Sequence, residues 1–243
     1  MRSIKNLVEY YDELFPVTEA KKSFFSNFAG EFKTPVHFLS IQCGTGLLEN
    51  HLARQGHDVT GIENAEELLQ AANLRRRSQL MFIRFFQMFI PDIAKFLGKS
   101  FYNVIYVMNN RLMFFPGAEA IQNFMCDAKK LLAPQGILVF EMVNFEKFGD
   151  SKLVTLKTRE SVRSKLFTEI LTDENGARTV SINVENSSEK ILPVLSNVPV
   201  YPVTPTELEH FAEKAGFSSA EFYADFEKSP FNGNEESYVV VIK

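Results

Sequence analysis

The sequence predicts an α/β fold with a seven-stranded, mostly parallel sheet whose last strand is antiparallel, plus an inserted antiparallel β segment. Three observations support this prediction. Short β-branched runs alternate with stretches of helical periodicity through residues 36–148, which is typical of βαβ units. Residues 166–184 then alternate with period two. The last two apolar runs are joined by a loop too short for a crossover helix, so they should pair antiparallel.

The elements of the parallel part follow in order. The first strand ends at the turn former Gly44, and the leucine spacing of the next helix ends at Gly56. The third strand is apolar on both faces, as a buried parallel strand should be. A break at residues 133–136 separates the last helix of this part from the fifth strand. We expect strands at 36–41, 58–63, 81–87, 103–108 and 137–143, and helices at 47–55, 66–74 and 117–132.

The pattern changes after Phe148. An antiparallel hairpin is predicted around residues 173–176, and four prolines between 193 and 205 keep the following stretch extended and unsuited to a central strand. Thr204 and Glu207 form a capping box that opens a helix ending at Gly216. Strands at 217–224 and 238–242 complete the sheet. We therefore predict one α/β domain from residues 1–148 and 201–243, and an inserted β lid or substrate segment at 149–200.

Composition excludes several classes of protein. The chain has 243 residues, of which 45% are hydrophobic and 23% charged, a balance that suits one domain or at most two small ones. A net charge of -4 leaves no basic footprint for nucleic acid. The longest apolar run, 80–90, is too short and too interrupted for a membrane span, and no signal peptide is recognisable. Cys43 and Cys126 lack disulfide spacing, so we expect a cytoplasmic protein, with its oligomeric state open.

A strand that runs into a glycine turn and then a helix is the most informative segment. The turn, residues 42–46, should lie at the carboxyl edge of the sheet, where backbone N–H groups can approach a ligand. Glu63 ends the second strand nineteen residues after Gly44, where a carboxylate can accept both hydroxyls of a ribose. Glu49 stands where a dinucleotide fingerprint needs a small residue, so a pyrophosphate is disfavoured. Together these features predict an adenosine-type ligand.

The chain resembles the class I S-adenosylmethionine-dependent methyltransferases, which have a Rossmann-like sheet. Residues 42–46 resemble their first motif, 59–64 the second, and 130–138 the junction before the fifth strand. Residues 108–112, 200–204 and 222–231 resemble small bacterial glycine and sarcosine N-methyltransferases. The first motif departs from the family at Ser40, where an acidic residue is usual, and at Gln42, which places a large side chain at the first glycine. After the third strand, Gln87 stands where the family has an Asp that contacts adenine.

This resemblance implies S-adenosylmethionine as cofactor and assigns residues to it. Glu63 would hold the ribose and Asn64 the adenine edge, Asn109 would lie at the reactive centre, and Tyr10 or Tyr11 would approach the sulfonium. The cofactor-binding set is Tyr11, Gln42, Cys43, Gly44, Thr45, Gly46, Glu63, Asn64, Gln87, Met88, Met108 and Asn109, and the catalytic set is Asn109, Tyr201 and Arg111.

Several residues have a second interpretation. Arg111 is either the cation for an acceptor carboxylate or an exposed arginine at a helix start, and Tyr201 either lines the substrate pocket or is an ordinary tyrosine beside a proline turn. Arg75, Arg76 and Arg77 form either a solvated helix end or an anion patch. No metal is expected, since Glu141 and Asn144 alone do not make a site.

Two functions therefore stand side by side. The first is methyl transfer from S-adenosylmethionine to a small-molecule acceptor, an amine or an amino acid, in which alignment of the reactants replaces a catalytic triad. The second is a degenerate methyltransferase-like protein that binds the cofactor weakly or not at all and has a non-catalytic binding role. Glu63 favours the first, whereas Ser40 and Gln42 favour the second.

Overall fold

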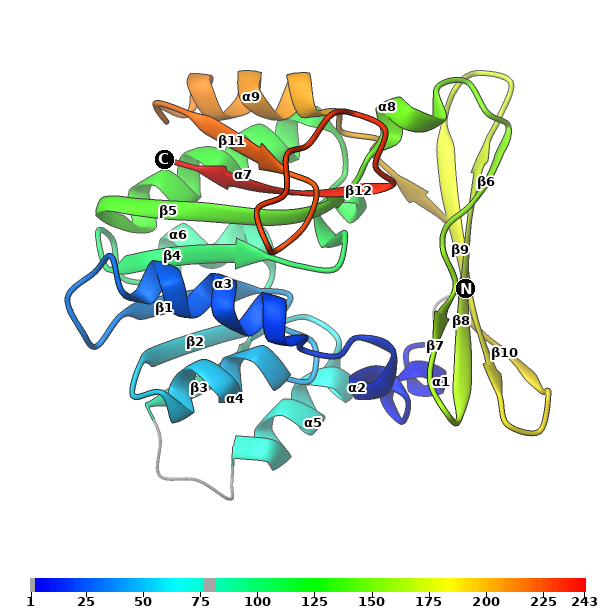
Figure 1. Ribbon diagram of the computed structural model, residues 1–243, viewed down its shortest axis with the longest axis horizontal. Helices are drawn as coiled ribbons and strands as arrows, with labels where there is room; N and C mark the ends of the chain where they lie inside the picture. Colours follow the sequence, from blue (N-terminus) through cyan, green and yellow to red (C-terminus); the bar gives the residue numbers. More distant parts are fainter. Residues whose placement is uncertain (1–2, 77–81) are drawn as a thin grey trace.

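Two β-sheets make up the framework of the protein (Figure 1). The structure is a computed structural model that describes residues 3–76 and 82–243. The larger sheet has the strand order β3-β2-β1-β4-β5-β12-β11, in which β12 runs antiparallel to both neighbours. Its strands are β1 (His37–Ile41), β2 (Asp58–Glu63), β3 (Ile83–Gln87), β4 (Tyr102–Val107), β5 (Leu132–Val143), β11 (Ala220–Tyr223) and β12 (Ser237–Ile242). The predicted fold class is confirmed.

Helices cover both faces of this sheet, because its central strands are apolar on both sides. One face carries α3 (Glu19–Ala29), α4 (Leu47–Arg54) and α5 (Glu66–Arg76), and the other carries α6 (Ile93–Phe96), α7 (Ala118–Leu131) and α9 (Pro205–Lys214). Short 3-10 turns η1 (Ile90–Asp92) and η2 (Arg111–Phe114) follow β3 and β4. The capping box of α9 forms as predicted, with Thr204 and Glu207 bonding each other's backbone N–H groups.

The segment after β5 builds the second sheet, in the order β10-β9-β8-β6 with β7 paired to β8. After α8 (Phe145–Phe148) come β6 (Leu153–Thr155), β7 (Arg159–Glu160), β8 (Ser164–Thr172), β9 (Arg178–Asn186) and β10 (Ile191–Val200). The hairpin predicted around residues 173–176 is the β8–β9 pair. Pro193 and Pro199 lie in β10, an edge strand with irregular register, where a missing N–H is tolerated.

The amino-terminal segment joins the two sheets. Helices α1 (Lys5–Val8) and α2 (Tyr11–Leu14) place Leu7 and Leu14 in one apolar core with Val180 and Val194 of the second sheet. The second sheet thus faces the carboxyl edge of the first across this segment (Figure 1). The division at residues 149–200 remains a prediction, but the inserted strands share their core with the chain's beginning.

Some boundaries differ from the predictions. Residues 133–136, predicted as a break, lie within β5 as an irregularity, because pairing moves from Tyr102–Leu132 to Val104–Ile137 with Gln135 at φ +64° between them. The predicted start of the third strand at residue 81 and the last residue of the arginine run, Arg77, lie outside the described residues. Within 3–76 and 82–243, no helix is both long and apolar enough to cross a membrane.

Candidate active site at the carboxyl edge of the sheet

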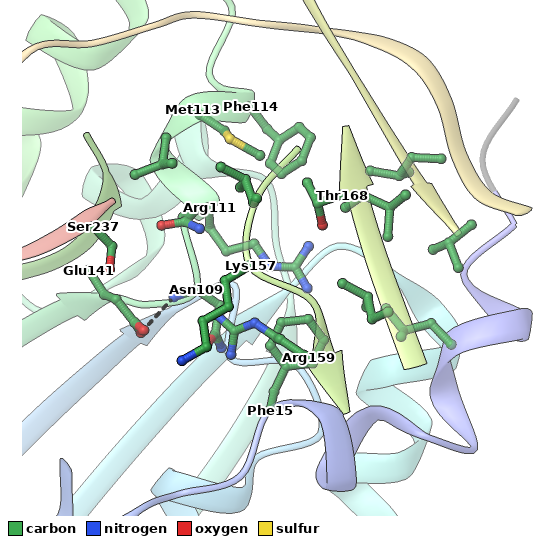
Figure 2. Close-up of a pocket in the computed structure, with 18 of the residues that line it drawn as sticks. Phe15, Asn109, Arg111, Met113, Phe114, Glu141, Lys157, Arg159, Thr168 and Ser237 are labelled. Atoms are coloured by element: carbon green, nitrogen blue, oxygen red, sulfur yellow. Dashed lines mark hydrogen bonds between the residues drawn. The ribbon is translucent and has the colours of Figure 1, made fainter. Parts of the chain in front are cut away.

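Three cavities meet at the carboxyl ends of the parallel strands. The Glu63 cavity, about 600 Å³, is lined by Gln42, Glu63, Asn64 and the start of the chain at residues 3–5. The Glu141 cavity, about 310 Å³, lies between the two sheets and is lined by residues such as Asn109 and Glu141 (Figure 2). The Glu49 cavity, about 40 Å³, lies beside the glycine turn and contains Glu49 and Ser40 in its lining. Arg111 lines both larger cavities, so they share a wall at the end of β4.

The glycine turn is held in a left-handed backbone conformation at three positions. Gln42, Gly44 and Gly46 have φ values of +56°, +62° and +71°. A Cβ on Gly44 would come within 2.3 Å of the Tyr11 hydroxyl, and a Cβ on Gly46 would come within 2.5 Å of the Phe85 ring. Gly44 therefore allows the close approach of Tyr11, while Gly46 allows α4 to pack on β3. The missing side chain of Gly46 makes room for the core, and its place beside the cofactor remains a prediction.

Glu63 organises the turn from the end of β2. It is 2% exposed, and Gly44 N donates to its Oε2 at 2.9 Å. Asn64 N and Ala65 N donate to Oε1 at 2.9 and 3.0 Å. Since each carboxylate oxygen carries two lone pairs, these bonds leave acceptor capacity toward the cavity. Glu63 can therefore fix the turn and still accept a hydroxyl.

Tyr11 and Arg111 lie between the cavities. The Arg111 Nη2 donates to the Tyr11 hydroxyl at 3.4 Å, and the Tyr11 ring stacks on Phe15 at 4.8 Å between ring centroids. Burial raises the pKa of Tyr11, and nearby Arg111 only partly opposes this. Burial alone would lower the pKa of Arg111, but Tyr11 and the negative Glu63 outweigh it and raise that pKa. Arg111 is therefore a cation of the site rather than an exposed arginine at a helix start.

Asp12 ties the same segment to the turn. Its carboxylate accepts from the Thr45 hydroxyl and forms an ion pair with Arg75 of α5. Arg75 thus belongs to a specific pair, although the sequence had left it as a solvated helix end or an anion patch. These contacts hold α2 over the glycine turn.

Glu141 of the Glu141 cavity forms an ion pair with Lys21, which lines the neighbouring Glu49 cavity. Lys21 Nζ lies 2.9 Å from Glu141 Oε2, and Asn109 N donates to the same oxygen at 3.0 Å (Figure 2). Burial would raise the pKa of Glu141, but Lys21, Arg159 and the Asn109 N–H together lower it. Asn109 and Asn110 follow β4 with φ values of +57° and +60°, a conformation that asparagine tolerates better than most side chains. The strained turn presents the Asn109 N–H to Glu141.

Two further cations reach toward this cavity from the second sheet. Figure 2 shows Lys157 and Arg159 directed toward the space that Arg111 and Glu141 also line. The Arg159 guanidinium lies over the Phe15 ring, 4.7 Å from its centroid. The lining also contains the carboxylate of Glu236, which accepts from Lys157 N at 2.9 Å. Because Lys21 balances Glu141, the three cations Arg111, Lys157 and Arg159 still exceed this one remaining carboxylate.

The predicted site residues line different cavities at this edge of the sheet. Gln42, Glu63 and Asn64 line the Glu63 cavity, while Tyr11, Gln42, Cys43, Thr45, Met108 and Asn109 line the Glu49 cavity. Gln87 and Met88 line a separate shallow cavity of about 400 Å³ beyond β3. The structure therefore brings most of the set together at one sheet edge, with Gln87 and Met88 at its margin.

Tyr201 was predicted to be catalytic, but the structure gives its hydroxyl another partner. The hydroxyl donates to Glu207 Oε1 at 2.6 Å, beside the cap of α9, and Tyr201 is not in the lining of the Glu141 cavity. Burial and the Glu207 carboxylate raise the pKa of Tyr201 to about 12. This contact directs the Tyr201 hydroxyl toward α9, and a catalytic role for Tyr201 remains a prediction from the sequence.

Four residues of the site escaped the sequence reasoning. Lys21 lies 120 positions from Glu141, and no local pattern relates them. Lys157 and Arg159 belong to an insertion whose placement the sequence did not define. Glu49 was noted only for its size, although a carboxylate on the apolar side of a predicted helix is a recognisable signal.

The unpartnered atoms at this edge indicate what kind of ligand the site fits. Gln42 Oε1 and Glu49 Oε2 are buried acceptors that make no hydrogen bond within residues 3–76 and 82–243. Their neighbour Glu63 retains acceptor capacity, so the site suits a ligand rich in donors, such as the ammonium and ribose hydroxyls of S-adenosylmethionine. The residues present therefore fit this cofactor. The described residues contain no group of three or more His, Cys, Asp or Glu side chains that could hold a metal ion.

Comparison with known proteins also indicates a methyltransferase. Residues 38–136 match a family model described as a methyltransferase domain. A ubiquinone biosynthesis O-methyltransferase of Psychrobacter cryohalolentis is 33% identical over 107 residues, which are 44% of this chain and 40% of that protein. A protein named as a methyltransferase in Geobacillus sp. (strain WCH70) is 27% identical over 104 residues, 43% of this chain and 41% of its own length. The chain thus spans about two fifths of these relatives.

Solved structures resemble nearly the whole chain. The CcbJ methyltransferase from Streptomyces caelestis superposes with a TM-score of 0.80 at 20% identity, covering 98% of this chain and 96% of its own. CalS10 of Micromonospora echinaspora, an amino pentose methyltransferase solved with S-adenosylmethionine bound, gives a TM-score of 0.66 at 16% identity, covering 92% and 89%. At such identities the likeness concerns the fold.

Proposed function

We propose that this chain is a class I S-adenosylmethionine-dependent methyltransferase that transfers the cofactor's methyl group to a small-molecule amine. Amino acids are the acceptors that the site supports best. S-adenosylmethionine supplies a methyl group on a positively charged sulfur, so the chain itself has to bind, orient and exclude water.

One observation carries the proposal: Arg111 is a wall of both the Glu63 cavity and the Glu141 cavity. A ligand anchored at Glu63 and a second molecule in the Glu141 cavity would therefore be neighbours at the end of β4. The Glu141 cavity has about 310 Å³, near the lower end of the range of small-molecule sites, which favours a small acceptor. Phe15 and Phe114 supply apolar lining that keeps water from this junction.

Glu141 supports an amine as the acceptor. Its lowered pKa keeps it ionised at neutral pH, so it can accept a hydrogen bond from an acceptor N–H. The same lowered pKa makes Glu141 a weak base. Its role would be to orient the nitrogen lone pair rather than to remove a proton. Asn109, whose N–H holds Glu141 Oε2, would keep that orientation fixed.

The positive charge of the cavity supports an acceptor with a carboxylate. Arg159 and Arg111 carry planar guanidinium groups that match a carboxylate in geometry, and Lys157 adds a third cation. Among the similar structures, CalS10 is an amino pentose methyltransferase, which makes an amine-bearing acceptor compatible with this fold.

The test is label transfer from methyl-labelled S-adenosylmethionine to a panel of glycine, sarcosine, a primary amine without a carboxylate, and a phenol. We expect label in the amino acids, and a loss of about 10- to 100-fold in Glu141→Gln with little change in cofactor affinity. Glu119→Gln, an exposed carboxylate on α7, is the matched control. Transfer to the phenol in preference to the amines would refute the amine proposal.

A non-catalytic role is the second candidate, favoured by one observation. The Tyr11 hydroxyl lies so close to Gly44 that the turn is covered rather than open to a ligand. Titration with S-adenosylhomocysteine separates the two candidates, because the degenerate protein would show no saturable binding at millimolar concentration. A cytoplasmic location and the expectation of no nucleic-acid or membrane partner remain predictions from composition.

A further inference from the structure

A buried carboxylate beside the glycine turn lacks a full set of partners. Glu49 lies in the first turn of α4 with its side chain turned inward, and it is 2% exposed. The Tyr106 hydroxyl of β4 donates to its Oε1 at 2.8 Å. Its Oε2 is also shielded from solvent and makes no hydrogen bond within the described part of the chain. An ionised carboxylate has about four acceptor sites, so Oε2 keeps capacity for a further donor, although Ser40, Tyr106 and the Glu49 backbone N–H all favour the charged form.

The neighbours of Glu49 do not fully compensate its charge. Burial raises the pKa of Glu49, while Ser40, Tyr106 and the more distant Arg75 pull it back only in part. Glu49 in turn contributes to raising the pKa of Tyr106, after the larger effect of burial. Leaving a charge inside a protein without compensation costs several kcal/mol, so such a group usually serves a ligand or a proton.

The position of Glu49 Oε2 suggests that it binds a ligand. Glu49 lines the cavity of about 40 Å³ together with Ser40, Thr45 and Tyr11. That space exceeds what one water molecule needs and admits a group the size of an ammonium. Gln42 lines both this cavity and the larger Glu63 cavity, and its Oε1 is the other buried acceptor without a partner. One ligand could therefore extend from Glu63 to Glu49 past Gln42.

We infer that Glu49 pairs with the α-ammonium group of the cofactor's amino-acid moiety. This inference rests on the proposed function, since it assigns a role within the same cofactor site. An ammonium offers three donors, and Glu49 Oε2 and Gln42 Oε1 supply two acceptors for it. The Glu49 carboxylate comes from α4 and lies beside the Ser40 hydroxyl of β1. A serine hydroxyl carries no charge, so the negative charge that pairs with the ammonium comes from Glu49. Glu49 is thus a binding residue that selects the charged amino-acid end of the cofactor.

Binding measurements on unreacting ligands test this directly. S-adenosylhomocysteine is compared with its desamino analogue, which keeps the adenosine and the carboxylate but lacks the ammonium, by calorimetric titration of the full chain. We expect the wild type to favour S-adenosylhomocysteine by about 10- to 100-fold, and Glu49→Gln to reduce this preference to below about threefold. Glu119→Gln on α7 should keep the full preference, and thermal unfolding of each variant reports whether it is folded.

The outcomes separate the inference from the proposed function. An unchanged preference in folded Glu49→Gln, or an equal loss of affinity for both ligands, overturns the role of Glu49 while cofactor binding stands. If the wild type binds neither ligand, both proposals are overturned. If Glu49→Gln does not fold, the wild type gives the answer through the pH dependence of its affinities.

The sign of that pH dependence follows from the charge. Pairing with an ammonium lowers the pKa of Glu49 in the complex relative to the free protein, so binding of S-adenosylhomocysteine should weaken as pH falls through the free-protein pKa. The charged or titratable groups near Glu49 are Tyr106 of β4, Cys43 of the turn, Arg75 of α5 and, in the wall of the same cavity, Lys21 of α3. Tyr106 and Cys43 have raised pKa values, and Lys21 pairs with Glu141, so Glu49 is the group expected to titrate on the acid side. Equal pH dependence for the desamino analogue would overturn the inference.

Discussion

Replacing Glu63 by alanine should destabilise the protein even without any ligand. The carboxylate accepts three backbone N–H groups, from Gly44 at 2.9 Å, Asn64 at 2.9 Å and Ala65 at 3.0 Å. Alanine leaves all three donors without this acceptor. The substitution should therefore lower the free energy of unfolding of the unliganded protein, in addition to weakening binding of the ribose.

The magnitude follows from where the donors lie. The Gly44 N–H is buried, so its charge-assisted bond is worth about 1.5–3 kcal/mol. Asn64 is exposed and Ala65 half-buried, so water can partly replace Glu63 there, and roughly 0.5–1.5 kcal/mol is expected for each. We therefore expect Glu63→Ala to lower the free energy of unfolding by about 2.5–6 kcal/mol.

Urea denaturation of the unliganded protein, followed by circular dichroism, measures this free energy. Glu67→Ala is the matched control, because Glu67 lies in the first turn of α5 and its carboxylate accepts no hydrogen bond within the described residues. The control should lose less than about 1 kcal/mol. A loss below about 1 kcal/mol in Glu63→Ala would refute the argument that Glu63 holds the turn. Calorimetry on the folded fraction should also show binding of S-adenosylhomocysteine weakened by about 1.5–3 kcal/mol.

Three further predictions concern the neighbouring elements. Gln42→Gly should raise the free energy of unfolding by about 1 kcal/mol, because its φ of +56° suits glycine, yet weaken S-adenosylhomocysteine binding through loss of the buried Oε1. Lys21→Met should cost about 3–5 kcal/mol at neutral pH by leaving Glu141 unpaired, whereas Lys22→Met, which breaks an exposed pair, should cost under 1 kcal/mol. Replacing residues 149–199 by a short Gly/Ser linker should abolish methyl transfer and weaken S-adenosylhomocysteine binding about tenfold or more, since Leu195 lines the Glu63 cavity.

Each of these has its own check. The Lys21 effect should shrink in acid, because the lowered pKa of Glu141 stabilises the fold above its unfolded-state pKa and that contribution is lost as pH falls through the folded value. A pH-independent difference between Lys21→Met and the wild type would contradict the ion pair. Tighter cofactor binding by Gln42→Gly would show that its side chain obstructs the site. Undiminished cofactor binding by the shortened chain would show that the second sheet is not part of that site.

Local sequence patterns determined much of the fold. The alternation of β-branched and helical runs, the glycine turn, the capping box at Thr204 and the prolines of β10 all act between residues close in the chain. They defined the order of strands and helices and the antiparallel last strand. They also placed Glu63 next to the glycine turn, because the ends of adjacent parallel strands must meet at one edge.

Only the tertiary structure decided which side chains complete the site. Lys21 meets Glu141 across 120 positions, and Tyr106 meets Glu49 across 57, through packing of α3 and α4 on the sheet. Charge pairs and cavities depend on how separate elements pack. The hydrophobic periodicity of a helix or strand predicts which of its faces is buried, but not which other element that face contacts. The physical reason is that these contacts are non-local, whereas the patterns in the sequence are local.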